Sequence, residues 1–210
     1  MALLHRAELR PTKLDLLAAW LPTRSWFAGT AGADLTRLAT YRFDDPAGEV
    51  GIETLLVRAG DGPVLQVPLT YRGAPLPGAD QWLVGTTEHS VLGPRWVYDA
   101  CADPVYLPAL AAAVLAGAGQ AEEYFEVNGE REVRPPNMTV TGGGTRGAEP
   151  PAVGTLREVV DGDPTLIRAE QADLAVVRRP SPGELPADAC LTGAWPNQPT
   201  PLVLAYALPR

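Results

Sequence analysis

The sequence has little of the positive charge that nucleic-acid-binding surfaces need. Of its 210 residues, 17 are Lys or Arg and 25 are Asp or Glu, which gives a formal net charge of -8. Lys13 is the only lysine, and the arginines are scattered along the chain without forming a cluster. Because binding to phosphates requires grouped cations, these features disfavour a nucleic-acid partner.

Cysteines are also few, and long apolar runs are missing. Cys101 and Cys190 lack the spacing of metal or redox motifs, so we expect buried free thiols, with a disulfide only if folding brings them together. The most apolar stretch, residues 107–118, is too short to cross a bilayer, and residues 1–11 lack the apolar segment of a signal peptide. We therefore expect no membrane partner and a cytoplasmic location.

Proline and glycine, by contrast, are abundant. The chain has 22 Pro and 21 Gly, about a fifth of its residues, and 46% of its residues are hydrophobic. This mixture is typical of a globular protein built from many short elements joined by turns. The length suits one core or two small subdomains. We predict a strand-rich α+β fold.

Residues 1–134 are predicted to form an α+β unit in which two helices pack on an antiparallel sheet. Residues 12–21 favour a helix with Thr12 as its N-cap. A second helix, rich in Ala and Leu, is predicted over residues 104–115 with Asp103 as its N-cap. Its apolar character predicts burial against the sheet or another subdomain. Strands are expected at residues 35–43, 50–59, 64–71, 82–84 and 95–98.

Residues 135–151 are predicted to be a Pro- and Gly-rich linker. Three glycines at 142–144 suggest a phosphate cradle, but such a loop needs a helix directly after it, and Glu149-Pro150-Pro151 follows. We therefore interpret the segment as flexible. Beyond it, residues 152–210 are predicted to form a small antiparallel β-rich unit, with strands at 152–160, 165–169, 174–178, 191–195 and 202–208.

Several short motifs resemble a known family. The run Leu-Pro-Thr-Arg-Ser-Trp-Phe-Ala-Gly at residues 21–29 is similar to the opening of the N-terminal cap of actinobacterial maltokinases and related amino-sugar kinases. Further matches follow in the same order: Gln-Val-Pro-Leu at 66–69, Tyr-Asp-Ala at 98–100 and Asp-Pro at 103–104. The resemblance spans roughly residues 12–125 and implies a cap-like domain.

The departures from that family matter as much as the matches. Residues 169–171 and 177–179 are similar to parts of the kinase intermediate subdomain, but the family's nucleotide-contacting lysine falls at Ala175 in this chain. At the cap signature, Ser25 replaces an arginine and Thr30 stands near an expected lysine. No catalytic-lobe motif or Walker loop is recognisable in the sequence. We therefore expect a stand-alone cap-like protein that lacks the catalytic lobe.

The candidate site residues are the aromatic and acidic side chains of these motifs. Trp26, Phe27, Tyr98 and Asp99 form the possible binding surface. An exposed tryptophan can stack on a sugar ring, although core packing is the alternative for each of the tryptophans. Asp99 has a structural alternative too, since a carboxylate early in a turn often binds backbone amides. We predict no catalytic, cofactor-binding or metal-binding residues.

The sequence leads to three functional hypotheses. The first is a non-catalytic protein-interaction or regulatory module linked to sugar or α-glucan metabolism, and the resemblance implies a sugar kinase or α-glucan enzyme as its partner. The second is a module that binds a small sugar. The third is a divergent sugar kinase.

Overall fold

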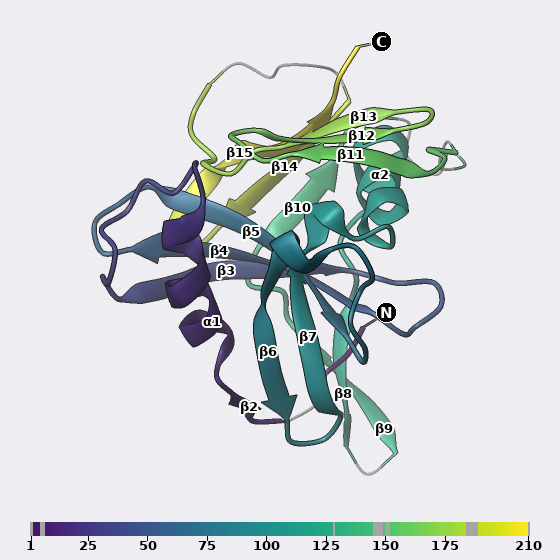
Figure 1. Cartoon of the computed structure of the whole chain (residues 1–210). Helices are drawn as coiled ribbons and strands as arrows, with labels where there is room; N and C mark the ends of the chain where they lie inside the picture. Colours follow the sequence, from purple (N-terminus) through teal and green to yellow (C-terminus); the bar gives the residue numbers. More distant parts are fainter. Residues whose placement is uncertain are drawn as a thin grey trace.

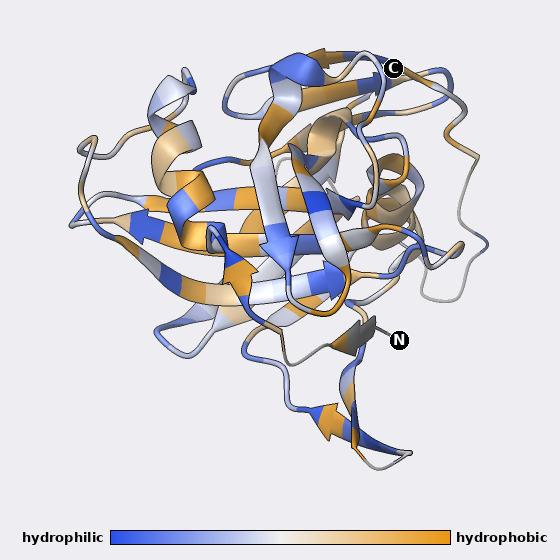
Figure 2. Ribbon diagram, turned by 60° about the horizontal axis from the view of Figure 1, so that its bottom comes forward, coloured by the Kyte–Doolittle hydropathy of each residue, from blue (hydrophilic) through white to orange (hydrophobic). Residues whose placement is uncertain are grey.

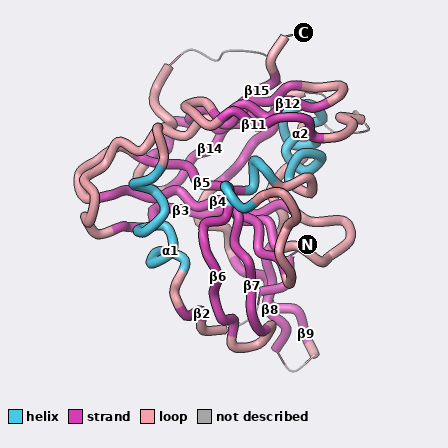
Figure 3. Tube along the Cα trace, in the orientation of Figure 1, coloured by secondary structure: helices cyan, strands magenta, loops and turns pink. Residues whose placement is uncertain are grey.

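The computed structural model describes residues 2–4, 7–127, 129–144, 149, 152–183 and 189–209. In this part of the chain strands dominate, and the two α-helices are α1 (Lys13–Trp20) and α2 (Tyr106–Ala116) (Figure 3). Short 3-10 turns form at η1 (Leu21–Thr23), η2 (Asp80–Trp82) and η3 (Ala100–Ala102). The predicted α+β class is confirmed.

The first sheet has six strands, and all its neighbouring strands run antiparallel. Its spatial order is β2 (Leu9–Arg10), β6 (Leu83–His89), β7 (Gly93–Asp99), β5 (Val64–Arg72), β4 (Gly51–Ala59) and β3 (Leu35–Phe43). Figure 2 shows apolar and polar residues alternating along its strands, as expected when successive side chains point to opposite faces. The strands predicted at 35–43, 50–59 and 64–71 are confirmed.

Helix α1 covers one face of this sheet. Thr12 and Asp15 form a capping box, in which the Thr12 side chain accepts from the Asp15 amide and the Asp15 carboxylate accepts from the Thr12 amide. The helix buries Leu17 and Trp20 in one hydrophobic cluster with Leu55, Val57, Leu65, Val67, Leu69 and Val97 of the sheet. The predicted helix and its N-cap are therefore confirmed.

The second sheet also has six antiparallel strands. Its order is β10 (Thr139–Gly142), β14 (Cys190–Trp195), β15 (Gln198–Ala207), β13 (Asp173–Val176), β12 (Thr165–Ala169) and β11 (Leu156–Val160). In Figure 1 this sheet lies above the first one, with α2 beside it. One hydrophobic cluster contains residues of α2, of the first sheet and of the second sheet, so the two predicted units share a core.

The segment predicted as a linker is partly a strand. β10 pairs with β14, and its Gly142 approaches α2 so closely that an added Cβ would lie 2.1 Å from the Ala113 carbonyl oxygen. Gly144 has φ +75°, and a Cβ there would lie 2.2 Å from the Leu115 carbonyl oxygen. These glycines allow close packing on α2, so flexibility is not their role here. Residues 145–148, 150 and 151 of the expected linker lie outside the described residues.

The start of α2 agrees in part with the expectation. The regular helix begins at Tyr106 with Val105 in the N-cap position, but Asp103 has an extended backbone and its Oδ1 accepts from the Val105 amide at 3.1 Å, which is the hydrogen bond of a capping side chain. Both carboxylate oxygens of Asp103 accept from the Arg72 guanidinium at 2.6 Å, and the side chain is 0% exposed. Asp103 therefore caps the turn that leads into α2 and forms a buried ion pair at the same time. The predicted helix end is confirmed, since Gly117 has the left-handed conformation that closes α2.

A third, smaller sheet was not predicted. It consists of β1 (Ala2–Leu4), β8 (Glu123–Val127) and β9 (Glu130–Arg134), with β1 parallel to β8. The β8–β9 hairpin projects from the body at the bottom of Figure 1. Across the ranges that the structure describes, neither helix has the length and apolar character needed to traverse a bilayer.

Candidate functional site

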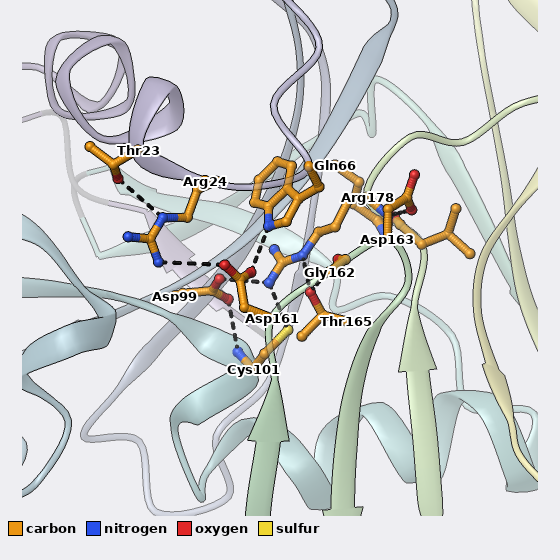
Figure 4. Close-up of polar contacts among 12 residues, drawn as sticks. Thr23, Arg24, Gln66, Asp99, Cys101, Asp161, Gly162, Asp163, Thr165 and Arg178 are labelled. Atoms are coloured by element: carbon orange, nitrogen blue, oxygen red, sulfur yellow. Dashed lines mark hydrogen bonds and ion pairs between the residues drawn. The ribbon is translucent and has the colours of Figure 1, made fainter.

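Trp26, the first aromatic residue of the motif at residues 21–29, is buried inside the protein. Trp26 is only 3% exposed, and its ring centroid lies 5.9 Å from that of Trp20, in an edge-on arrangement. The indole Nε1 donates a hydrogen bond of 2.7 Å to Asp161 Oδ1, in the loop between β11 and β12. Arg24 approaches the same carboxylate, with its Nη1 3.8 Å from Asp161 Oδ2 (Figure 4). The chain after α1 is therefore tied to the second sheet.

Arg178 is the centre of this region. Its guanidinium lies 4.7 Å from the centroid of the Trp26 ring, which is a cation–π distance. Nη2 donates to Asp99 Oδ2 at 2.6 Å, and Nε donates to Thr165 Oγ1 at 2.7 Å (Figure 4). The side chains of Arg178 and Asp99 are both 0% exposed. So deep a charge pair is tolerated because each ion meets the other and further hydrogen bonds.

Backbone contacts strengthen the same connection. The Arg178 amide donates to Asp163 Oδ1 at 2.9 Å, and its carbonyl accepts from the Gln66 amide at 2.8 Å. The Gln66 side chain donates to the carbonyls of Val177 and Leu204 at 2.9 and 2.8 Å. Gln66 belongs to β5 in the first sheet, whereas Leu204 lies on β15 in the second. We call the set Trp26, Gln66, Asp99, Asp161 and Arg178 the joint.

Electrostatics fix the charge states in the joint. Burial alone would lower the pKa of Arg178, but the adjacent Asp99 carboxylate raises that pKa above its usual value. Burial raises the pKa of the Cys101 thiol well above its usual value, although Arg178 opposes this. Cys101 therefore stays protonated at neutral pH, while Asp99 accepts its amide at 3.1 Å and caps η3. The guanidinium Nη1 of Arg178 is buried and has no hydrogen-bond partner among the described residues.

This arrangement is suited to holding two sheets together. Acid–base or nucleophilic chemistry needs a titratable group that reaches a substrate. Asp99, Cys101 and Arg178 are each at most 1% exposed, so none of them reaches solvent. Within the residues that the structure describes, no group of three or more His, Cys, Asp or Glu side chains is placed to hold a metal ion.

The predicted site residues do not share one surface. The structure brings Trp26 and Asp99 together, because both contact the Arg178 guanidinium. Phe27 is half-buried and packs against the cluster under α1. Tyr98 is 1% exposed, and its hydroxyl accepts from the Leu76 amide in a different cluster. As neighbours on β7, Tyr98 and Asp99 point to opposite faces. Trp26 and Tyr98 are therefore core residues.

Sequence reasoning missed Arg178 as a partner of Asp99. It noted the Val-Arg-Arg motif at 177–179 and the Gln66 motif only as family echoes. The two charged residues are 79 positions apart, and no local signal joins them. The clue in hindsight is that an arginine, the residue suited to buried ion pairs, follows two positions after an apolar strand.

A second charged cluster lies at the start of α1. Lys13 forms an ion pair with Glu53, and its ammonium is 5.1 Å from the centroid of the Tyr71 ring. Arg42 Nη2 lies 3.3 Å from Glu53 Oε1, and the Tyr71 hydroxyl donates to Oε2 at 2.9 Å. Burial alone would raise the pKa of Glu53, but Arg42 and Lys13 lower it to about 2. The only lysine of the chain is thus held in a stabilising pair.

Exposed apolar side chains stand out at the β6–β7 turn. Val91 is 57% and Leu92 is 43% exposed. Both of their amides donate to His89 Nδ1, at 3.2 and 3.0 Å. Ser90 exchanges two hydrogen bonds of 3.0 Å with Glu8, which precedes β2. The turn therefore displays two adjacent apolar side chains on a backbone that its own contacts hold in place.

Comparison with known proteins identifies part of the chain. Residues 20–103 match the family model of the maltokinase N-terminal cap domain, and this confirms the predicted cap-like family for less than half of the chain. No curated protein matches the sequence significantly. The matched segment runs from the end of α1 to η3 and its flanking Asp103, so it contains three joint residues, Trp26, Gln66 and Asp99.

Proposed function

We propose, on the premise that residues 20–103 form a maltokinase N-terminal cap domain, that the chain is a non-catalytic protein-interaction or regulatory module. The observation that carries this proposal is the β6–β7 turn, where Val91 and Leu92 are exposed side by side. A rigid apolar pair suits a protein interface, because little conformational entropy is lost when it binds. The partner we propose is a sugar kinase or an α-glucan enzyme, in line with the name of the matched family.

The burial of the joint residues decides where we place the contact with the partner. Trp26 and Asp99 are buried against Arg178, so they are engaged inside the chain. We therefore place the outer contact at the β6–β7 turn and not at the aromatic signature. A cytoplasmic location stays a prediction from the sequence.

The non-catalytic part of the proposal has support at Ala175. This is where an ungapped match placed the family's nucleotide-contacting lysine, and it lies on β13 with 0% exposure. A phosphoryl-transfer site needs a cation that reaches the nucleotide phosphates. A buried alanine supplies none.

Co-purification from native extract tests the interaction. The bait is the full chain, and the test variant is V91S/L92S, which removes the exposed apolar pair while its amides can still bind His89. V160S is the matched control, because Val160 is an exposed valine, 37% accessible, and is the last residue of β11 in the second sheet. We expect a reproducible partner with the wild type and V160S, and at least a tenfold loss with V91S/L92S. A partner retained by V91S/L92S, or no partner at all, would overturn the proposal.

A further inference from the structure

A cleft lies beside β3, the edge strand of the first sheet. It has a volume of about 320 Å³ and is lined by Thr40 of β3, by residues 119–123, and by residues 133–134 and 136–140 around the connection from β9 to β10. This volume is at the lower end of the range for small-molecule sites, about 300–1,000 Å³. The cleft is separate from the joint and from the β6–β7 turn.

The walls of the cleft are fixed by backbone hydrogen bonds. The Thr40 amide donates to Asn137 Oδ1 at 2.9 Å, and the Ala121 amide donates to the Arg42 carbonyl at 2.8 Å. Gln120 binds the opposite wall, where it accepts from the Val140 amide at 2.8 Å and donates to the Met138 carbonyl at 3.1 Å. The first two of these bonds occupy the Thr40 amide and the Arg42 carbonyl on β3, the edge strand of the first sheet. The cleft is therefore preformed, and a ligand would not have to order its walls.

Glu123 is the polar group with unused capacity. Its side chain is 12% exposed and lies between two guanidiniums, with Arg134 Nη1 at 3.3 Å and Arg42 Nε at 3.5 Å. The pairs Arg178–Asp99, Arg72–Asp103 and Arg179–Asp163 are much shorter, each at 2.6 Å. Arg42 Nε is buried and forms no hydrogen bond with any residue that the structure describes. An ionised carboxylate has about four acceptor positions, so this loose group leaves some of them open to a ligand.

The mixture of charges selects the kind of ligand. The charged residues that line the cleft are Glu122, Glu123 and Arg134, so the lining carries both signs of charge and suits neither a simple anion nor a simple cation. A pair of hydroxyls suits both groups, because one can donate to Glu123 while its neighbour accepts from Arg134, which is 39% exposed. Val133, 53% exposed, adds an apolar wall for the C–H groups of a polyol.

We propose that this cleft binds a small neutral polyol, of about the size of one sugar ring, through Glu123 and Arg134. Neighbouring hydroxyls bind the carboxylate and the guanidinium, and the apolar face of the ligand contacts Val133. The proposal does not depend on the interaction at Val91 and Leu92, because no residue is shared between the two places.

Amide NMR titration of the full chain tests this proposal. The probes are glucose and myo-inositol at up to roughly 50 mM, about fifty times a millimolar dissociation constant, with inorganic phosphate as the anionic comparison. We expect saturable shifts from a neutral probe confined to residues 119–123 and 133–140, and none there from phosphate. No saturable shift, shifts mapping to Trp26, or a response to phosphate alone would overturn it.

Two variants separate binding from structure. R134Q should raise the dissociation constant about tenfold or more, because it removes the charged donor. R131Q, on the same hairpin but outside the cleft lining, should bind like the wild type. If the R134Q spectrum shows a changed fold, V133S serves in its place and should weaken binding by removing the apolar wall. Unchanged affinity in a folded R134Q or V133S would refute the assigned contacts.

Discussion

The joint makes a strong prediction for the variant D99N. Asparagine keeps the shape of Asp99 and an oxygen that can accept the Cys101 amide, but it removes the negative charge. Arg178 would then keep a buried positive charge, because a guanidinium stays protonated in proteins and the Arg178 side chain is 0% exposed. The substitution therefore tests the ion pair with little change in packing.

The expected loss in the free energy of unfolding is large for so small a change of side chain. Removing one partner of a buried ion pair costs about 3–5 kcal/mol, since the other charge is left uncompensated. The free energy of unfolding of a typical domain is roughly 5–15 kcal/mol, so this loss is a substantial fraction of the total. For a chain of this size it corresponds to a fall in melting temperature of about 6–20 °C.

Urea unfolding followed by tryptophan fluorescence and by circular dichroism measures the effect. R179M is the matched control, because Arg179 is the next residue and forms a 2.6 Å ion pair with Asp163, but its side chain is 45% exposed. An exposed pair of this kind contributes about 0–1 kcal/mol. The double variant D99L/R178M should recover part of the D99N loss, because no charge remains buried. If D99N costs no more than R179M, the joint does not hold the sheets together as argued.

Two further predictions concern stability. The fold lowers the pKa of Glu53 from an ordinary value of 4.5 to about 2. The ionised carboxylate therefore adds about 3 kcal/mol to the free energy of unfolding, which is fully present above pH 5 and is lost as the pH falls towards 2. When the free energy of unfolding is measured by urea at several pH values, E53Q should show a much smaller fall between pH 5 and pH 2 than the wild type. The same fall in both proteins would contradict the role of the carboxylate. G142A should lower the melting temperature markedly, because its Cβ would lie 2.1 Å from the Ala113 carbonyl oxygen. G119A is the control, since a Cβ at Gly119 meets nothing within 4 Å, and equal melting temperatures for the two variants would refute the close-packing argument.

Local signals in the sequence predicted the elements of the first sheet well. The α1 start follows from a capping box within four consecutive residues, Thr12 to Asp15, and the structure contains both of its hydrogen bonds. The strands at 35–43, 51–59 and 64–72 follow from β-favouring runs separated by Asp- and Gly-containing turns. Such features depend on neighbours in the chain, so they can be read without the fold.

Sequence reasoning failed where contacts with distant residues give a side chain its role. Asp103 was predicted only as a helix N-cap, but its carboxylate also binds Arg72 of β5. The glycines at 142 and 144 look like a linker, but their small size lets β10 and the residues after it approach α2. In both cases a tertiary contact gives the residue a role that the local sequence does not indicate, and composition gives no sign of which contact will form.

The sequence by itself determined the class of fold, the cap-like motifs and the lack of a recognisable kinase motif, because all of these depend on residue type and short-range order. Only the tertiary structure decided what the signature residues do. Trp26 and Asp99 were candidates for a binding surface, and the fold buries both of them against Arg178, which follows β13 of the second sheet. The physical reason is that a buried charge must find its counter-charge wherever the chain brings it, and that position is set by the packing of two sheets.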